Sequence, residues 1–339
     1  MGPRYLARKT IQAIITIAFV VILNFLLFRL MPGSPERVLL RNPHLNAQTI
    51  AAAREKWGLD KPLLPIEISF APPAVTLNPE SQLLSYLEST AAGDFGYSFQ
   101  YRGSTVVDVI EGSFWPTIIL IGLAEIIAIV VGLSLGSTAG WKRGGSLDRV
   151  GNGISLILYS MPYFVIGMPL IIIFAVELGW FPTSGMLSPG AHYDSLFDQL
   201  LDFLHHLVLP LATVSLGLIG GYSILMRSSI IDTRSEDYVT TARAKGLTDR
   251  TVLRAHAFPN ALLPTVTVIA INLGYVVAGA ITAEIVFNWP GLGTLTVDAL
   301  AARDYPVLQG IFLLISVAVI IANLGADLVY GRLDPRVRA

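Results

Sequence analysis

Hydrophobic residues gather in six long runs along this chain, and polar residues gather between them. The runs cover about 11–31, 114–139, 154–176, 207–226, 263–287 and 307–330. Each run is long enough to cross a hydrocarbon layer about 30 Å thick. No water is available in lipid to satisfy a broken backbone, so each run is predicted to be helical. The pattern therefore predicts an all-α, polytopic membrane protein with six transmembrane helices.

Lys and Arg residues indicate which polar segments face the cytoplasm. They cluster at the N-terminus, in the 140–150 and 227–262 segments and in the C-terminal tail, whereas 177–206 has none and 288–306 has only Arg303. The positive-inside rule then places both termini and the 227–262 segment in the cytoplasm. The first run is too long for a removable signal peptide and lacks its small-residue cleavage site, so it is predicted to stay as an anchor.

The segment 32–113 is long enough to be exempt from the charge rule and is predicted to lie outside the membrane. Helices are expected at 46–57 and 81–92, the second ended by Gly93. Five prolines between them predict a loop over 62–79. The resulting organisation is an anchor helix at 1–31, an extracytoplasmic segment at 32–113, a five-helix core at 114–330 and a cytoplasmic tail at 331–339.

Composition narrows the class of protein further. The chain is 53% hydrophobic and only 14% charged, which is unusual for a soluble domain. Its net charge of −1 gives no general attraction to nucleic acid. It has no cysteine, which excludes disulfides, thiolate metal sites and cysteine nucleophiles.

The polar, basic segment 235–264 between two hydrophobic runs predicts a pair of short helices. Ser235 can cap the first helix, and Gly246 supplies a left-handed stop with Leu247 just beyond it. A compact, capped helix pair between membrane spans is suited to act as a rigid contact for a cytoplasmic partner. We call this segment the 235–264 loop.

The second helix of the 235–264 loop is expected to begin after Thr248, which can cap it, and to run to about Phe258. Pro259 and Pro264 are expected to bracket its exit.

Side chains of the 235–264 loop suit contact with another protein. Arg243, Lys245 and Arg250 could reach acidic residues of a partner, and Asp237 could meet a basic one. Ala242 and Gly246 are small, so a partner could approach closely.

The loop also resembles a known signature. Permeases of bacterial ABC importers carry a Glu-Ala-Ala run, a Gly shortly after it and an apolar residue followed by Pro at the end. The matching positions here are Thr240, Thr241, Ala242 and Gly246, with the ending near Leu263-Pro264. Threonine at the first two positions is similar to the variant loop of peptide-type permeases.

Other stretches resemble the dipeptide, oligopeptide and nickel type of ABC importer permease. They are PGSP at 32–35, GLDKP at 58–62, GDFGYS at 93–98, WPT at 115–117, FPTSG at 181–185 and EIVFNWPGLGTLTVDALAARDYPVLQG at 284–310. The chain departs from the family pattern at 64–80, which is longer and rich in proline.

This resemblance implies a type I importer fold in which two permeases form the pore. The expected partners are a second, similar permease, one or two ATPase subunits that receive the 235–264 loop, and an extracytoplasmic binding protein. Peptides are the expected substrate, with nickel or glutathione as alternatives. The chain has no Walker A motif, so ATP and Mg²⁺ are expected on the partner ATPases, with no cofactor and no catalysis on this chain.

Several polar residues lie within or near the hydrophobic runs. Glu125 and Asn272 are candidates to line a pore, or to hydrogen-bond a neighbouring helix. Glu284 and Asp304 match acidic positions of the family and are expected to hold the outer ends of the last two spans together.

Other classes of function have weaker support. Gly132 to Gly136 spells a nominal G-x-S-x-G, but a membrane helix supplies neither the turn nor the histidine of a hydrolase. Close helix crossing explains those glycines, and likewise Gly217 and Gly221. A gradient-driven secondary transporter or channel is the main rival, although it would need coupling charges or broken helices at the midplane.

Overall fold

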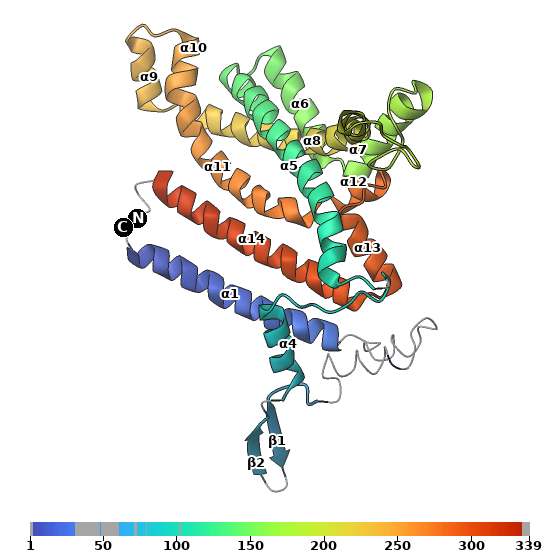
Figure 1. Cartoon of the computed structure of the whole chain (residues 1–339). Coiled ribbons are helices and arrows are strands. Elements are labelled where there is room, and N and C mark those ends of the chain that lie inside the picture. Colours follow the sequence, from blue (N-terminus) through green and yellow to red (C-terminus); the bar gives the residue numbers. More distant parts are fainter. Residues whose placement is uncertain are drawn as a thin grey trace. The chain divides into compact units, whose positions relative to one another are not determined.

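The computed structural model describes residues 3–30, 48, 61–70, 73–78, 80–101 and 103–333, and it is almost entirely helical (Figure 1). The described parts of Met1–Lys9, Ser113–Thr294 and Ala318–Ala339 form one compact unit, and those of Thr10–Gly112 and Leu295–Val317 form a second. The helices are α1 (Pro3–Leu30), α4 (Gln82–Ala91), α5 (Val106–Trp141), α6 (Ser146–Ser160), α7 (Tyr163–Leu170), α8 (Leu196–Arg234), α9 (Asp237–Ala244), α10 (Asp249–Val252), α11 (Phe258–Tyr275), α12 (Ile281–Val286), α13 (Leu292–Ala302) and α14 (Tyr305–Leu333).

Among the described residues, five helical segments are long and apolar enough to cross a membrane. They are Tyr5–Leu30, Val106–Trp141, Leu196–Arg234, Asp249–Ala278 and Tyr305–Leu328. A sixth span is present if two helices joined at a sharp bend count as one, namely α6 with α7 and the π-helical turn Ile171–Glu177. The prediction of an all-α membrane protein is therefore confirmed, and the predicted number of six spans is reached when the bent pair counts as one.

The third predicted run, 154–176, is not one continuous helix. The chain bends by 104° between α6 and α7. Met161 takes an extended backbone with ψ of 129°, and Pro162 follows it. The residue before a proline is pushed away from helical geometry, so the helix ends there although the sequence remains apolar on both sides.

The fifth predicted run, 263–287, is also divided. The helical span starts earlier, at Asp249, and ends in a 3₁₀ turn at Val276–Ala278. Gly279 follows with φ of +74°, a backbone geometry that favours glycine, and α12 begins two residues later. The composition alone did not show this break because both sides of it are hydrophobic.

The predicted loop at 62–79 is instead a β-hairpin in the second unit. Strand β1 (Ile66–Phe70) pairs antiparallel with β2 (Pro73–Leu77), in a register that sets Ile66 opposite Leu77 and Phe70 opposite Pro73. Alternation of apolar and polar residues in 66–70 is a strand signal, and a proline is tolerated at the first position of a strand. The number of prolines concealed this signal.

The predicted helix at 81–92 is confirmed as α4. The Ser81 hydroxyl accepts a hydrogen bond from the Leu84 amide at 3.3 Å, and Gly93 follows the helix with φ of +74°. The helix predicted at 46–57 lies outside the described residues, apart from residue 48. The PGSP stretch at 32–35 and residues 334–339 of the predicted tail also lie outside them.

Small residues bring α5 and α8 into close contact in the first unit. A Cβ atom added at Gly136 would lie 2.4 Å from the Ser223 carbonyl oxygen, and one at Gly132 would lie 2.7 Å from the Tyr222 Cβ. Gly220 allows the same approach between α8 and the Ser155 backbone of α6. The predicted close crossing at glycine pairs is confirmed for Gly132 and Gly136.

Candidate functional site

The 235–264 loop begins with a short helix, α9, and a tight stop (Figure 1). Glu236 occupies the N-cap position, whereas Ser235 ends α8 and its hydroxyl donates to the Asp232 carbonyl oxygen at 2.7 Å. The prediction of Ser235 as the cap was therefore wrong, because α8 continues through residues expected to be a loop. Gly246 has φ of +79° and supplies the predicted left-handed stop.

The second helix of the 235–264 loop starts where expected but does not end at Phe258. Thr248 caps α10, its hydroxyl accepting from the Thr251 amide at 3.4 Å. A π-helical turn at Leu253–Ala257 then carries the chain directly into α11. Pro259 lies in the first turn of α11, where its missing N–H is tolerated, and Pro264 lies inside the helix. The prolines therefore do not end the helix, and the loop is joined rigidly to a membrane span.

The inner face of the 235–264 loop is buried against the helices that cross the membrane. Val239, Ala242 and Val252 are at most 4% exposed and form one hydrophobic cluster with Met226 and Ile230 of α8. The small side chain of Ala242 thus fits this packing, which corrects the expectation that it leaves room for a partner.

Trp141, the last residue of α5, connects that helix to the 235–264 loop. The Arg243 guanidinium lies 4.8 Å from the Trp141 ring centroid, and the Arg234 guanidinium lies 5.9 Å from it. Arg234 also donates to the Trp141 carbonyl oxygen at 3.0 Å. Cation–π contacts of this kind contribute about 0.5–1 kcal/mol each near a surface. Movement of α9 is therefore mechanically linked to α5 and α8, which the spacing of residues in the sequence did not predict.

The outer face of the 235–264 loop is polar and exposed. Its exposed residues include Asp237, Thr240, Thr241, Arg243, Lys245, Gly246 and Arg250. Arg243 also lies 3.5 Å from Asp249. Partial burial raises the pKa of the Tyr238 hydroxyl, and nearby Glu236 adds to the effect. The structure thus brings seven of the eight predicted contact residues to the surface, and buries Ala242.

An ion pair that the sequence analysis missed joins the start of α6 to the C-terminal part of α8. Arg227 donates to Asp148 through two nitrogens, at 2.5 and 3.0 Å, and the Gly144 amide donates to the same carboxylate at 2.8 Å. The two charged residues are 79 positions apart. One basic residue of the 227–262 segment, Arg227, is therefore paired with an acidic residue of the same chain.

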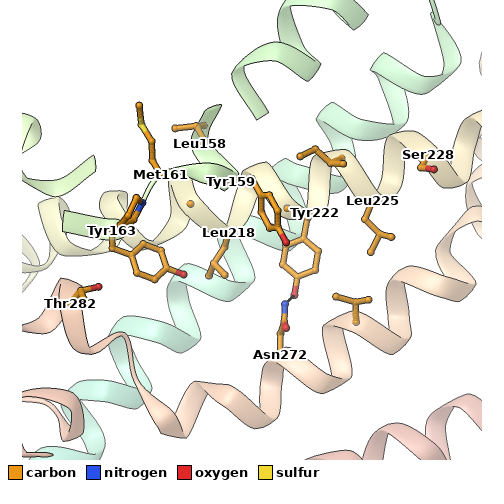
Figure 2. Close-up of a pocket in the computed structure, with 15 residues that line it drawn as sticks. Leu158, Tyr159, Met161, Tyr163, Leu218, Tyr222, Leu225, Ser228, Asn272 and Thr282 are labelled. Carbon is orange, nitrogen blue, oxygen red and sulfur yellow. Dashed lines mark hydrogen bonds between the residues drawn. The ribbon is translucent and has the colours of Figure 1, made fainter. Parts of the chain in front are cut away.

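A cavity of about 770 Å³ opens among α6, α7, α8, α11 and α12. Figure 2 shows Tyr159, Tyr163 and Tyr222 around it, with Asn272 entering from α11. Pockets of about 300–1,000 Å³ are typical of small-molecule sites. The bend at 161–162 brings Met161, Pro162 and Tyr163 into the lining, so the interrupted span helps to form the cavity.

Glu125, Tyr222 and Asn272 form a connected polar group beside this cavity. The Tyr222 hydroxyl donates to the Glu125 carboxylate. The Asn272 amide nitrogen donates to the Tyr222 oxygen at 2.9 Å (Figure 2). Glu125 is 2% exposed, whereas Asn272 lines the cavity. A pore-lining role for either residue stays a prediction. The sequence analysis did not include Tyr222, because a tyrosine among apolar residues gives no separate signal.

Glu284 is fully buried where α12 meets α5 and the start of α13. It accepts hydrogen bonds from the Thr117 hydroxyl at 2.9 Å and from the Gly293 and Thr294 amides at 2.7 and 3.1 Å. A Cβ atom at Gly291 would lie 2.4 Å from a Glu284 oxygen. Its partners are thus in α5 and α13, whereas the sequence led us to expect a bond between the last two spans.

Asp304 is fully buried in the second unit, just before α14. It accepts from the Ser98 hydroxyl at 2.5 Å and from the Phe99 and Gln100 amides, each at 3.0 Å. It therefore fixes the loop that precedes α5, in a region predicted to face the outside.

Two family models together match nearly the whole chain. Residues 128–339 match the binding-protein-dependent transport system inner membrane component, and residues 3–121 match the N-terminal membrane component of the same systems. The chain belongs to this family. It is a multi-pass inner-membrane permease of an ABC importer, as the sequence resemblance implied, and a gradient-driven transporter or channel is not favoured.

Similar proteins of known or inferred role support the same family. A probable peptide ABC transporter permease, y4tP of Sinorhizobium fredii, is 37% identical and covers 98% of this chain and 99% of its own. The glutathione transport system permease GsiC of Escherichia coli K12 is 35% identical, with 98% of each chain covered.

A solved structure shares the fold. It is an inward-facing conformation of the MetNI methionine ABC transporter, which matches with a TM-score of 0.54 at 17% identity. The match covers 67% of this chain and 97% of the other. At this identity the likeness concerns the fold alone.

Proposed function

We propose that this permease forms half of a translocation pore for peptides and couples to a separate ATPase through the 235–264 loop. The arrangement of that loop carries the proposal. Its polar outer face is exposed, its inner face is buried against α8, and Trp141 ties it to α5. A force applied to the outer face would therefore reach the helices that line the cavity.

The remaining half of the pore would come from a second, similar permease. One or two ATPase subunits would hold the ATP and Mg²⁺, and an extracytoplasmic binding protein would deliver the substrate. This chain would itself be non-catalytic and need no cofactor. The exposed basic residues Lys245 and Arg250 would meet acidic side chains of the ATPase, and Asp237 a basic one.

Peptides are the proposed substrate, with glutathione as the alternative. One relative is described as a probable peptide permease and another as a glutathione permease, so both chemistries occur at 35–37% identity. Threonine at 240 and 241 is similar to the peptide-type loop. A nickel substrate stays a further alternative from the sequence resemblance.

Single cysteines can test the coupling proposal, because the chain has none of its own. Thr241→Cys would place a thiol on the exposed face of α9, and Ala242→Cys would place one on its buried face. With a bifunctional thiol reagent applied to the complex in mild detergent, Thr241→Cys is expected to crosslink to an ATPase subunit. The matched Ala242→Cys chain is expected to react at least tenfold more slowly.

A Thr241→Cys chain that purifies alone, gives no crosslink and still transports without ATP would contradict the proposal. Mass spectrometry of the crosslinked product identifies the partner, and ATP-dependent uptake in proteoliposomes provides the second measurement.

A further inference from the structure

The cavity among α6, α7, α8, α11 and α12 has an uncharged lining. Among the described residues that surround it, all side chains are aliphatic, aromatic or neutral polar groups. Removing an isolated charge from water costs several kcal/mol unless a partner compensates. The lining on this chain therefore favours a neutral, partly apolar part of a substrate over a charged one.

The polar group beside the cavity fixes the direction of the Asn272 amide. Because Tyr222 donates its only proton to Glu125, its oxygen must accept the hydrogen bond from Asn272. The Asn272 nitrogen therefore faces Tyr222, and its carbonyl oxygen is left as an acceptor. Glu125 is 2% exposed, so little water can compete with the Tyr222 hydroxyl for its carboxylate.

We infer that this cavity binds the uncharged middle of a peptide, with apolar side chains among Tyr159, Tyr163 and Leu225 and a peptide N–H donating to the Asn272 carbonyl oxygen. The inference rests on the proposed function, and it names the substrate class that the site selects. A volume of about 770 Å³ suits a short peptide. Glutathione carries two carboxylates and an ammonium group within three residues, so it would bring charge into a lining that offers it no counter-charge.

Protection of a single thiol measures binding in the cavity without requiring transport. Ser228 lines the cavity and is exposed, so Ser228→Cys supplies the only thiol on the chain. In the complete transporter in proteoliposomes, N-acetyl-trileucine amide is expected to slow its alkylation by N-ethylmaleimide. S-methylglutathione is expected to protect at least tenfold less well at equal concentration. An Asp194→Cys chain, with its thiol on an exposed segment outside the cavity, should show no protection.

Substitutions on α11 identify the residue responsible. In the Ser228→Cys background, Asn272→Leu should weaken protection by N-acetyl-trileucine amide about tenfold, and Asn272→Gln should restore part of it. Leu273→Ala is the matched control, because Leu273 lies next to Asn272 on the same helix, is 50% exposed and is not among the residues that line the cavity. Gel filtration checks that each complex stays assembled.

Equal protection by S-methylglutathione, or an Asn272→Leu chain that is protected as well as the parent, would overturn the inference. Failure of the proposed function looks different. In that case no peptide would be taken up in an ATP-dependent manner, even though N-acetyl-trileucine amide still protected the Ser228→Cys thiol and thereby supported the binding site.

Discussion

Trp141 shows how one side chain can join a surface loop to a membrane helix. It is 8% exposed, and it contacts Arg243 of α9 and Arg234 of α8 while its own backbone ends α5. No periodic pattern marks it, since a tryptophan at the end of a hydrophobic run is also typical of a membrane interface.

Replacing Trp141 with alanine is expected to loosen the 235–264 loop. Loss of a buried tryptophan costs about 3–5 kcal/mol, and the two arginines lose their aromatic partner. Thermal unfolding in detergent should shift to lower temperature, and ATP hydrolysis by the complex should continue with less uptake per ATP. Trp141→Phe should retain most of both. Trp115→Ala is the matched control, because that side chain is 58% exposed. Equal effects at Trp115 and Trp141 would contradict this role.

Two buried carboxylates, Glu284 and Asp304, depend on hydrogen-bond donors that are distant in the sequence. Glu284 and Asp304 were expected from the sequence to be structural, and each accepts several hydrogen bonds while fully buried. Their partners lie up to 206 positions away in the chain. These partners are known only from the folded structure. A buried acidic residue needs hydrogen-bond donors, but its position in the sequence does not indicate which residues supply them.

At the scale of elements, the crossing of α5 and α8 positions both the cavity and the loop. Tyr222 and Met226 lie on the face of α8 that α5 approaches through Gly132 and Gly136. Backbones at this distance leave no space for a Cβ atom, so the crossing depends on glycine.

Gly136→Ala is therefore expected to destabilise the permease by about 1–3 kcal/mol or more, because the added methyl group would lie 2.4 Å from the Ser223 carbonyl oxygen. The same substitution at Gly122 on α5 has no atom within 4 Å and should leave stability unchanged or improve it by up to about 1 kcal/mol. Thermal unfolding of the two chains makes the comparison. A Gly136→Ala chain as stable as Gly122→Ala would show that the two helices do not cross this closely.

At the scale of the whole molecule, the positions of Lys and Arg are the basis for the proposed orientation in the membrane. The 235–264 loop and both termini are proposed to face the cytoplasm, and 177–206 the outside. Within the first unit, Lys9 of α1 forms a 2.7 Å ion pair with Asp327 of α14, so helices from the two ends of the chain meet there.

Labelling from one side of the membrane tests this orientation. Asp194→Cys, in the exposed segment before α8, should react with a membrane-impermeant maleimide when the reagent is given access to the outer face of the inner membrane in whole cells. Thr241→Cys should react only in inside-out vesicles. The reverse pattern would invert the topology and remove the 235–264 loop from any cytoplasmic ATPase.

The sequence by itself determined the features that depend on neighbouring residues. Long apolar runs identified the membrane helices, Thr248 and Gly246 marked the turn of the 235–264 loop, and Gly132 with Gly136 marked a close crossing. These signals are local, because burial in lipid, capping and helix spacing act within a few turns. The resemblance of short motifs then gave the family.

The tertiary structure alone decided which distant groups meet. It showed the 104° bend before Tyr163, the burial of Ala242, and the polar group of Glu125, Tyr222 and Asn272, whose members are 50 and 97 positions apart. Hydrophobicity is the same on both sides of a bend, and a polar residue in a span does not specify its partner. The long-range packing of helices supplies that information, because it fixes which faces come within hydrogen-bonding distance.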